Sequence, residues 1–293
     1  MPLTPRVAVV IPVRDRAALV VEAIASVLAQ THRDLVLVVV DDGSLDGSAG
    51  AARAALAGAS VPARVLVQPG RGVAAARNAG AAAAGGEWIA FLDSDDLWLP
   101  GKLAAQMAWA DIRPRYRITQ TGERWLDRGR HRNPRAWHRK DERLFPRCLE
   151  RCLVSPSAVA IRRDLWVELG GFDEAFAVCE DYELWLRVGL REPVGLVPET
   201  LVVKRGGHPG QLSRSTWGLD RYRVAALAKL LADAALDAGE RAAVVTVLAS
   251  KCAVLAAGAA RRGRDAEAAR YRTLAAAAAE LAAPGVAASR RTA

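Results

Sequence analysis

The chain has 293 residues, a formal net charge of +9 and a pI of about 9.9, which together predict one α/β core with a smaller appended part and an anionic partner. Nucleotide phosphates, a lipid diphosphate or an acidic membrane surface would each match this charge. The four cysteines form no CxxC pair and no secretory signal opens the chain, so we expect neither structural zinc nor disulfides and we expect a cytoplasmic protein.

The first hundred residues alternate strand and helix signals, the pattern of a parallel sheet covered by helices. In chain order, the predicted strands span 6–12, 35–40, 64–68 and 88–92, and the predicted helices span 17–30, 48–58 and 73–84. Short acidic clusters follow the second and fourth strands. We therefore expect these clusters at the carboxyl edge of the sheet, where open α/β sheets bind their ligands.

Beyond Leu103 the hydrophobic periodicity weakens. Residues 113–140 are basic, contain Trp125 and Trp137, and predict a mobile lid on the acceptor side. Interleaved Arg, Lys and Trp also suit single-stranded nucleic acid, but no recognised motif accompanies them and we expect no nucleic-acid partner. Helices are predicted again over 144–152, 164–169 and 180–188, strands over 157–161 and 194–203, and a glycine-rich loop over 204–215.

From residue 219 onward the chain is Ala-rich and helical, with predicted breaks near 238–239 and 262–263. This change in composition predicts a domain boundary between residues 1–217 and a helical extension over 218–293. A bundle covering the sheet edge is favoured over a helical-repeat docking module. Charged residues interrupt the apolar stretches, so we expect no membrane span, while the basic charge is compatible with peripheral contact at the inner face of a membrane.

Three acidic clusters recur at predicted strand or helix ends: Asp41–Asp42, Asp93–Asp96 and Glu180–Glu183. Each one alone is typical of a turn or a helix cap. Gathered at one crevice, however, their carboxylates would repel one another unless a cation lay among them. Oxygen ligands suit Mg²⁺ or Mn²⁺, which commonly bridge carboxylates and a diphosphate, so the clusters predict a divalent metal site.

The motifs IPVRDR, VVVDDGS, GRGVAAARNAG, FLDSDDLW and CEDYELWLR follow in the order seen in inverting family 2 glycosyltransferases. From Val7 to about Ser215 the chain resembles that family. The resemblance implies a GT-A fold, with a mostly parallel central sheet between helices, followed here by the Ala-rich helical extension. Residues 1–217 would form the glycosyltransferase domain, with a nucleotide-binding half over about 1–100 and an acceptor half over about 101–217.

The resemblance also implies a reaction. A sugar would move from a nucleotide diphosphate sugar, with a UDP-sugar favoured, to a hydroxyl of a glycan, lipid-linked or small-molecule acceptor. The product would belong to bacterial polysaccharide or glycoconjugate synthesis. Among the donor-binding residues, Pro12, Asp41 and Arg77 would face the base, with Asp42 beside them, and Asp93 would reach the ribose.

The remaining implied roles concern the metal, the diphosphate and catalysis. Asp95 of the DxD motif would bind the metal, with His208 as a further ligand, and Lys204 and Arg214 would hold the diphosphate. Asp181 would be the general base that takes the acceptor's proton, and its non-catalytic alternative is a helix N-cap. Glu180 would contact the substrate and is the less favoured base.

Two other functions stay open at this point. Gly70, Gly72 and Ala75 spell GxGxxA between a strand and a helix, and Asp93 follows about 20 residues later, as in an NAD(P)-binding oxidoreductase. This element would be the third βα unit rather than the first, and it leaves the acidic clusters unexplained. The second alternative is a non-catalytic nucleotide-sugar binding protein.

Overall fold

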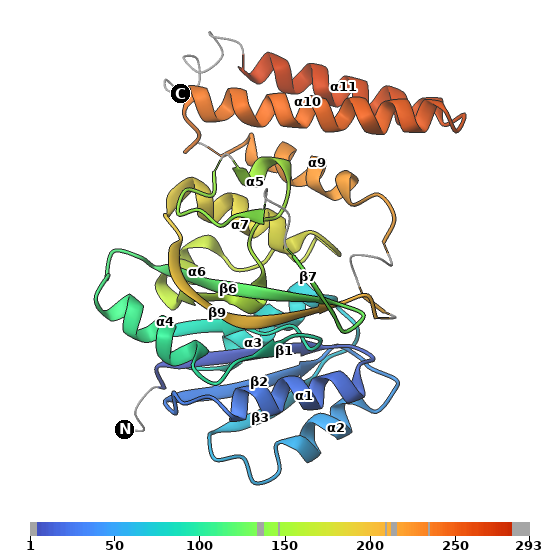
Figure 1. Cartoon of the computed structure of the whole chain (residues 1–293). Coiled ribbons are helices and arrows are strands. Elements are labelled where there is room, and N and C mark those ends of the chain that lie inside the picture. Colours follow the sequence, from blue (N-terminus) through green and yellow to red (C-terminus); the bar gives the residue numbers. More distant parts are fainter. Residues whose placement is uncertain are drawn as a thin grey trace.

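The computed structural model describes residues 5–133, 138–145, 147–208, 210–211, 216–233 and 235–282. Its strands are β1 (Val7–Val13), β2 (Leu35–Asp41), β3 (Ala63–Val67), β4 (Trp88–Phe91), β5 (Leu97–Trp98), β6 (Ile118–Asp127), β7 (Arg130–Arg132), β8 (Val159–Arg162) and β9 (Gly195–Gly206). They form one nine-stranded sheet in the order β3-β2-β1-β4-β8-β6-β9-β5, with β7 paired to β6 (Figure 1). The sheet therefore joins a parallel half to a mixed half.

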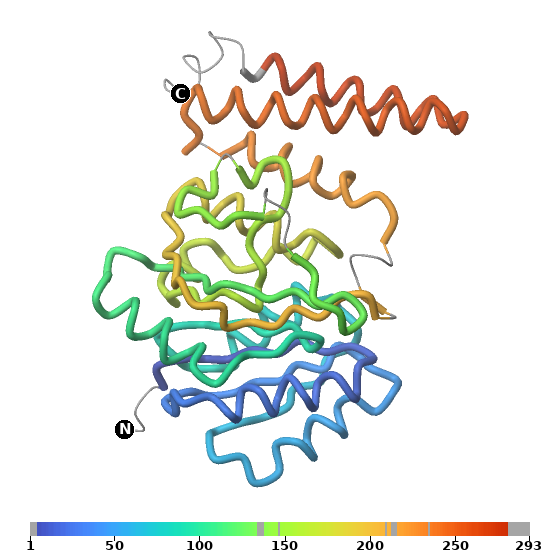
Figure 2. The backbone as a smooth tube through the Cα atoms, viewed as in Figure 1, coloured from blue at the N-terminus to red at the C-terminus, as the bar shows by residue number. Residues whose placement is uncertain are grey.

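Helices cover this sheet and extend beyond it. They are α1 (Ala17–Leu28), α2 (Ser48–Ala55), α3 (Val73–Ala83), α4 (Lys102–Asp111), α5 (Arg147–Glu150), α6 (Arg163–Leu169), α7 (Glu180–Arg191), α9 (Leu219–Leu230), α10 (Ala238–Ala260) and α11 (Asp265–Ala282), with a short 3-10 helix, η2 (Pro156–Ala158), before β8. The backbone trace places α10 and α11 at the end of the molecule far from the first strands (Figure 2).

Strand β1 is buried along its whole length because helices cover both of its faces. Val7, Val9 and Ile11 pack in one core cluster with α1, whereas Ala8 and Val10 pack in another with α3. A strand buried on both faces has a continuous apolar sequence, which explains why this run shows no alternation. Strands β1, β2, β3 and β4 are parallel, so their carboxyl ends meet at one edge.

The mixed half of the sheet corrects one expectation. Residues 118–132, expected to belong to a mobile lid, form β6 and β7 instead, and β6 lies between β8 and β9. The strand escaped prediction because three of its four buried residues are polar, namely Thr119, Gln120 and Thr121. Its register also shifts near Gly122. Trp137, the second tryptophan of the expected lid, lies outside the described residues.

The three carboxyl-terminal helices follow the sequence prediction closely. Helix α10 begins at a capping box in which the Asp237 carboxylate accepts from the Glu240 N–H at 2.7 Å and Glu240 accepts from the Asp237 N–H at 3.0 Å. Val224 and Leu227 of α9 belong to the same hydrophobic cluster as Trp185 of α7. The core thus continues past residue 217, and the boundary placed there stays a prediction.

Helix α10 also corrects the expectation that no segment has the length and composition of a membrane span. It has 23 residues and a mean hydropathy of 1.9 over its most apolar stretch, and it alone among the described helices passes that test. One third of this stretch is buried, and core helices of soluble proteins pass the same test. One such helix does not establish a membrane span.

The close approach of α3 to the sheet depends on Gly80. A Cβ at this position would overlap Val10 Cγ1 and lie 3.1 Å from Val40 Cγ2. We expect Gly80→Ala to lower the free energy of unfolding by about 1–3 kcal/mol in urea denaturation, because overpacking displaces the strands beneath. Gly50→Ala is the matched control, since a Cβ there meets nothing within 4 Å and should add up to about 1 kcal/mol of stability. Equal effects of the two changes would contradict this account.

Candidate active site

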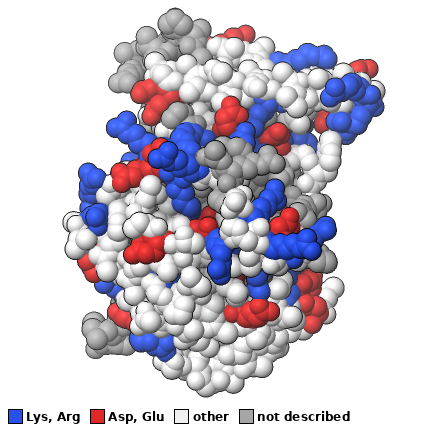
Figure 3. Space-filling view, in the orientation of Figure 1, with Lys and Arg blue, Asp and Glu red and all other residues white. Residues whose placement is uncertain are grey.

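A cavity of about 850 Å³ opens at the carboxyl edge of the parallel strands. Its walls come from the β1–α1 loop, the start of α3, the acidic segment after β4, the start of α7 and the end of β9. On the face seen in Figure 3, charged side chains of both signs gather over the middle of the molecule and its helical end, while the surface over α1 and α2 is largely uncharged.

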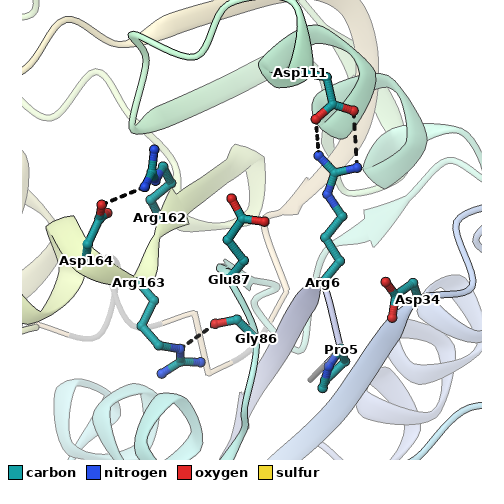
Figure 4. A pocket seen from close by; sticks show the side chains of 9 residues that line it. All are labelled: Pro5, Arg6, Asp34, Gly86, Glu87, Asp111, Arg162, Arg163 and Asp164. Carbon is teal, nitrogen blue, oxygen red and sulfur yellow. Dashed lines mark hydrogen bonds and ion pairs between the residues drawn. The ribbon is translucent and has the colours of Figure 1, made fainter. Parts of the chain in front are cut away.

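A second hollow of about 560 Å³ lies at the opposite edge of the sheet (Figure 4). Its charged groups largely pair with one another, since Arg6 binds Asp111 and Arg162 lies 2.8 Å from Asp164. It is lined by residues at the amino ends of β1 and β4, whereas open α/β sheets bind ligands at the carboxyl ends. The larger cavity is therefore the candidate active site.

An acidic cluster forms one wall of this cavity. Asp93, Asp95 and Asp96 each offer one carboxylate oxygen, and these oxygens lie within 4.8 Å of one another. Burial raises the pKa of Asp96 to about 7, although the Lys204 ammonium opposes the shift. Carboxylates this close, one of them resisting ionisation, fit a hard divalent cation that would relieve their repulsion.

His208 lies beside this cluster, as the sequence led us to expect. Its Nε2 is 2.8 Å from Asp95 Oδ2, so two residues predicted to bind one metal are in contact. Lys204 reaches the same cluster, donating to Ser155 Oγ at 2.8 Å and lying 3.6 Å from Asp96 Oδ2. Arg214, the other cation expected at the diphosphate, lies outside the described residues.

Arg77 connects the acidic cluster to helix α7. Its side chain is 4% exposed, and it donates to Asp93 Oδ1 at 2.7 Å and to Glu180 Oε1 at 2.6 Å. Burial raises the pKa of Glu180 to about 7; the Arg77 guanidinium opposes this rise, and the negative charge of Asp181 adds to it. We expected Arg77 to face the donor's base. It lines the cavity, where its guanidinium engages two acids of the wall, and its role toward the base stays a prediction.

Pro12 and Asp42 line the cavity, but Asp41 does not. Asp42 accepts from the N–H groups of Arg71 and Gly72 at 2.7 and 2.9 Å and so holds the glycine loop before α3. Asp41 is 1% exposed and accepts from the Ser44 N–H at 2.9 Å. Asp42 therefore borders the cavity, and Asp41, which we expected to face the nucleotide base, does not.

Asp181 is the remaining acid in the cavity, at the start of α7. Its Oδ1 accepts from the Tyr182 N–H at 2.7 Å, and its Oδ2 lies 3.4 Å from Cys152 Sγ, which donates to it. The N-cap residue of α7 is Cys179, so Asp181 does not occupy the capping position. Unlike Glu180, Asp181 forms no ion pair within the described part of the chain, and it is only partly buried.

Sequence reasoning missed two residues that complete these walls. Arg16 lies 3.1 Å from Asp95 Oδ2, and the Cys152 thiol contacts Asp181. Arg16 lies within the IPVRDR motif, which predicted that this segment belongs to the site but not that Arg16 pairs with Asp95. The sequence predicted only that Cys152 is a small buried apolar residue.

Comparison with known proteins settles the family. The family model described as Glycosyl transferase family 2 matches residues 8–169. The chain therefore belongs to glycosyltransferase family 2.

Two relatives show how far the similarity extends. An uncharacterized protein of Mycobacterium tuberculosis is 30% identical over 224 residues, covering 70% of this chain and 68% of that protein. An uncharacterized glycosyltransferase of Rickettsia felis is 29% identical over 196 residues, covering 67% of this chain and 32% of that protein. The chain spans about a third of the length of the first such relatives.

Solved structures confirm the GT-A fold of this family 2 member. S. aureus TarS 1–349 in complex with UDP-GlcNAc has a TM-score of 0.71 at 16% identity, covering 94% of this chain and 92% of that one. The mannosyltransferase PcManGT from Pyrobaculum calidifontis, in complex with GDP-Man and Mn²⁺, has a TM-score of 0.61 at 22% identity, covering 96% and 86%. Family membership removes the basis for the oxidoreductase alternative, and the GxGxxA sequence belongs to the third βα unit.

The elevated pKa of Glu180 predicts a pH dependence of stability. The folded-state value of about 7 exceeds the ordinary 4.5, so the stabilising contribution of the protonated group is complete below pH 4.5 and is lost as the pH rises through 7. Between these limits we expect wild type to lose about 1–3 kcal/mol of unfolding free energy relative to Glu180→Gln. Urea denaturation across this range measures the difference, and parallel profiles for the two proteins would contradict it.

Proposed function

We propose that this family 2 protein is a metal-dependent inverting glycosyltransferase that uses a nucleotide diphosphate sugar. The observation that carries the proposal is a single cavity with two kinds of acidic group. One is the cluster of Asp93, Asp95 and Asp96, suited to a divalent ion, and the other is Asp181 on a separate element. The complexes of TarS with UDP-GlcNAc and of the mannosyltransferase with GDP-Man and Mn²⁺ add support.

In this proposal the cluster and its neighbours bind the donor's polar end. Asp95 would hold Mn²⁺ or Mg²⁺, with His208 as a further ligand, and Asp93 would contact the ribose. A bound ion would supply Lewis-acid neutralisation of charge on the departing diphosphate. The charge of Lys204 persists because Asp96 raises its pKa against the opposing effect of burial, so it remains a cation beside the leaving group.

Asp181 would act on the acceptor. Its carboxylate takes the proton of the incoming hydroxyl while the acceptor oxygen bonds to the anomeric carbon. The bond from that carbon to the diphosphate oxygen breaks at the opposite face, which inverts the configuration. Glu180 suits this role less well because it already accepts from Arg77.

The donor and acceptor classes extend the proposal. We favour a UDP-sugar as donor and a glycan, lipid-linked or small-molecule acceptor in polysaccharide or glycoconjugate synthesis at the cytoplasmic side of the membrane. A Myxococcus xanthus relative named an O-antigen biosynthesis protein is 29% identical over 219 residues, 74% of this chain and 17% of that protein. Measuring the hydrolysis of a panel of nucleotide sugars with Mn²⁺ tests the donor class.

Nucleotide diphosphate binding should require a divalent cation, because the three carboxylates would otherwise repel the phosphates. Isothermal titration calorimetry with UDP and with GDP, in Mn²⁺ and in EDTA, measures the requirement. We expect affinity to fall at least about tenfold in EDTA, a loss of about 1.4 kcal/mol. Asp95→Asn should lower the affinity in Mn²⁺ in the same way. Equal affinities in Mn²⁺ and EDTA would refute metal dependence.

Asp181→Asn should lower turnover by about a hundredfold to ten-thousandfold, because the amide keeps the shape of the side chain but cannot accept the proton. Donor affinity with Mn²⁺ should stay near that of wild type. Initial-rate kinetics and calorimetry on the same preparation separate the two effects. Glu180→Gln is the neighbouring control and should retain most of the turnover. If Glu180→Gln loses turnover by this factor and Asp181→Asn retains most of it, Glu180 is the base and our assignment is wrong.

A further inference from the structure

Arg16 occupies an unusual position at the acidic cluster. Its Nη1 lies 3.1 Å from Asp95 Oδ2, and its Nη2 donates to the Gly210 carbonyl at 2.8 Å. His208 Nε2 lies 2.8 Å from the same Asp95 oxygen. The backbone N–H of Arg16 donates to Ser48 Oγ at 2.9 Å, so the main chain is fixed while the long side chain carries the contact.

Cations already face the acidic cluster. Arg77 lies against Asp93, Arg16 against Asp95 and Lys204 against Asp96, and Arg77 is shared with Glu180. A divalent ion added to this arrangement would bring excess positive charge, which an entering anion such as a diphosphate would offset. An ion at Asp95 would also lie close to the Arg16 guanidinium, and the two positive charges would repel each other.

The two partners of Asp95 differ in what they can do when a metal arrives. An imidazole nitrogen has a lone pair in its neutral form and can ligate the same ion as Asp95. A guanidinium has five N–H donors and no acceptor, so it cannot share a carboxylate oxygen with a metal at close range. Arg77 is enclosed between two acids, whereas Arg16 lines the cavity and is 18% exposed.

We propose that Arg16 is an exchangeable counterion: it neutralises Asp95 in the metal-free protein and binds the donor's diphosphate once Asp95 ligates a divalent ion. The inference rests on the proposed function. The planar guanidinium of Arg16 has a fork of N–H donors that matches two phosphate oxygens. Release from Asp95 would leave those donors available inside the same cavity. Arg16 therefore opposes the binding of metal alone and favours the binding of metal together with the nucleotide.

The test compares Mn²⁺ binding to wild type and to Arg16→Gln by calorimetry, first without nucleotide and then with UDP titrated at saturating Mn²⁺. We expect Arg16→Gln to bind Mn²⁺ alone at least about tenfold more tightly, because the competing charge is gone. It should bind UDP at least about tenfold more weakly in Mn²⁺, because the fork is gone. Arg16→Lys keeps the charge without the fork, so it should lose UDP affinity while its Mn²⁺ affinity stays near that of wild type.

Arg14→Gln is the matched control. Arg14 lines the same cavity but pairs with Asp42 at 3.7 Å, so its loss should leave Mn²⁺ affinity within about twofold of wild type. Unchanged Mn²⁺ affinity in folded Arg16→Gln, or an equal gain in Arg14→Gln, would overturn the exchange while leaving the proposed function intact. If wild type binds no Mn²⁺ even with UDP, the proposed metal dependence itself fails.

Discussion

One buried guanidinium holds the candidate site together. Arg77 reaches from α3 to Asp93 after β4 and to Glu180 at the start of α7, so it fixes the donor-side acids relative to the helix that carries Asp181. Removing it would leave the buried Glu180 and the partly buried Asp93 without their ion-pair partner, and breaking a buried pair in this way typically costs about 3–5 kcal/mol. The positions of both ends of the cavity therefore depend on a residue with no direct role in the proposed chemistry.

Internal ion pairs use some of the chain's basic residues. The net charge of +9 suggested an external anion, and the cations closest to the acidic cluster bind carboxylates of this chain. Arg77, Lys204 and Arg16 each neutralise a carboxylate of the acidic cluster, and Arg205 donates to the Asp95 carbonyl. Because each such pair contributes zero to the net charge, the excess of +9 resides in other cationic side chains. The cavity still contains exposed positive charge at Arg14, which is 56% exposed.

The parallel half of the fold could be predicted from the sequence to within a few residues, largely because β1, β2 and β4 are buried on both faces and leave unbroken apolar runs. The mixed half could not, since β6 places Thr119 and Gln120 at buried positions. Those polar groups find partners far along the chain, with Gln106 donating to Thr119 Oγ1 and Lys140 donating to Gln120 Oε1. Likewise, neighbouring acids at a strand end point to opposite sides, so the sequence did not distinguish Asp41 from Asp42 as the cavity residue.

The unpredicted half of the sheet is also what assembles the cations around the acids. Strand β5 directly follows Asp96, and it pairs antiparallel with β9 so that Leu97 lies opposite Val203. This register places Lys204 beside Asp96, and the continuing chain brings His208 to Asp95. A slip by one residue would turn the Lys204 side chain to the other face of the sheet. The acids can thus be recognised from their sequence motif. The positions of Lys204 and His208 depend on the pairing of β5, and a strand of two residues is too short to show a recognisable sequence pattern.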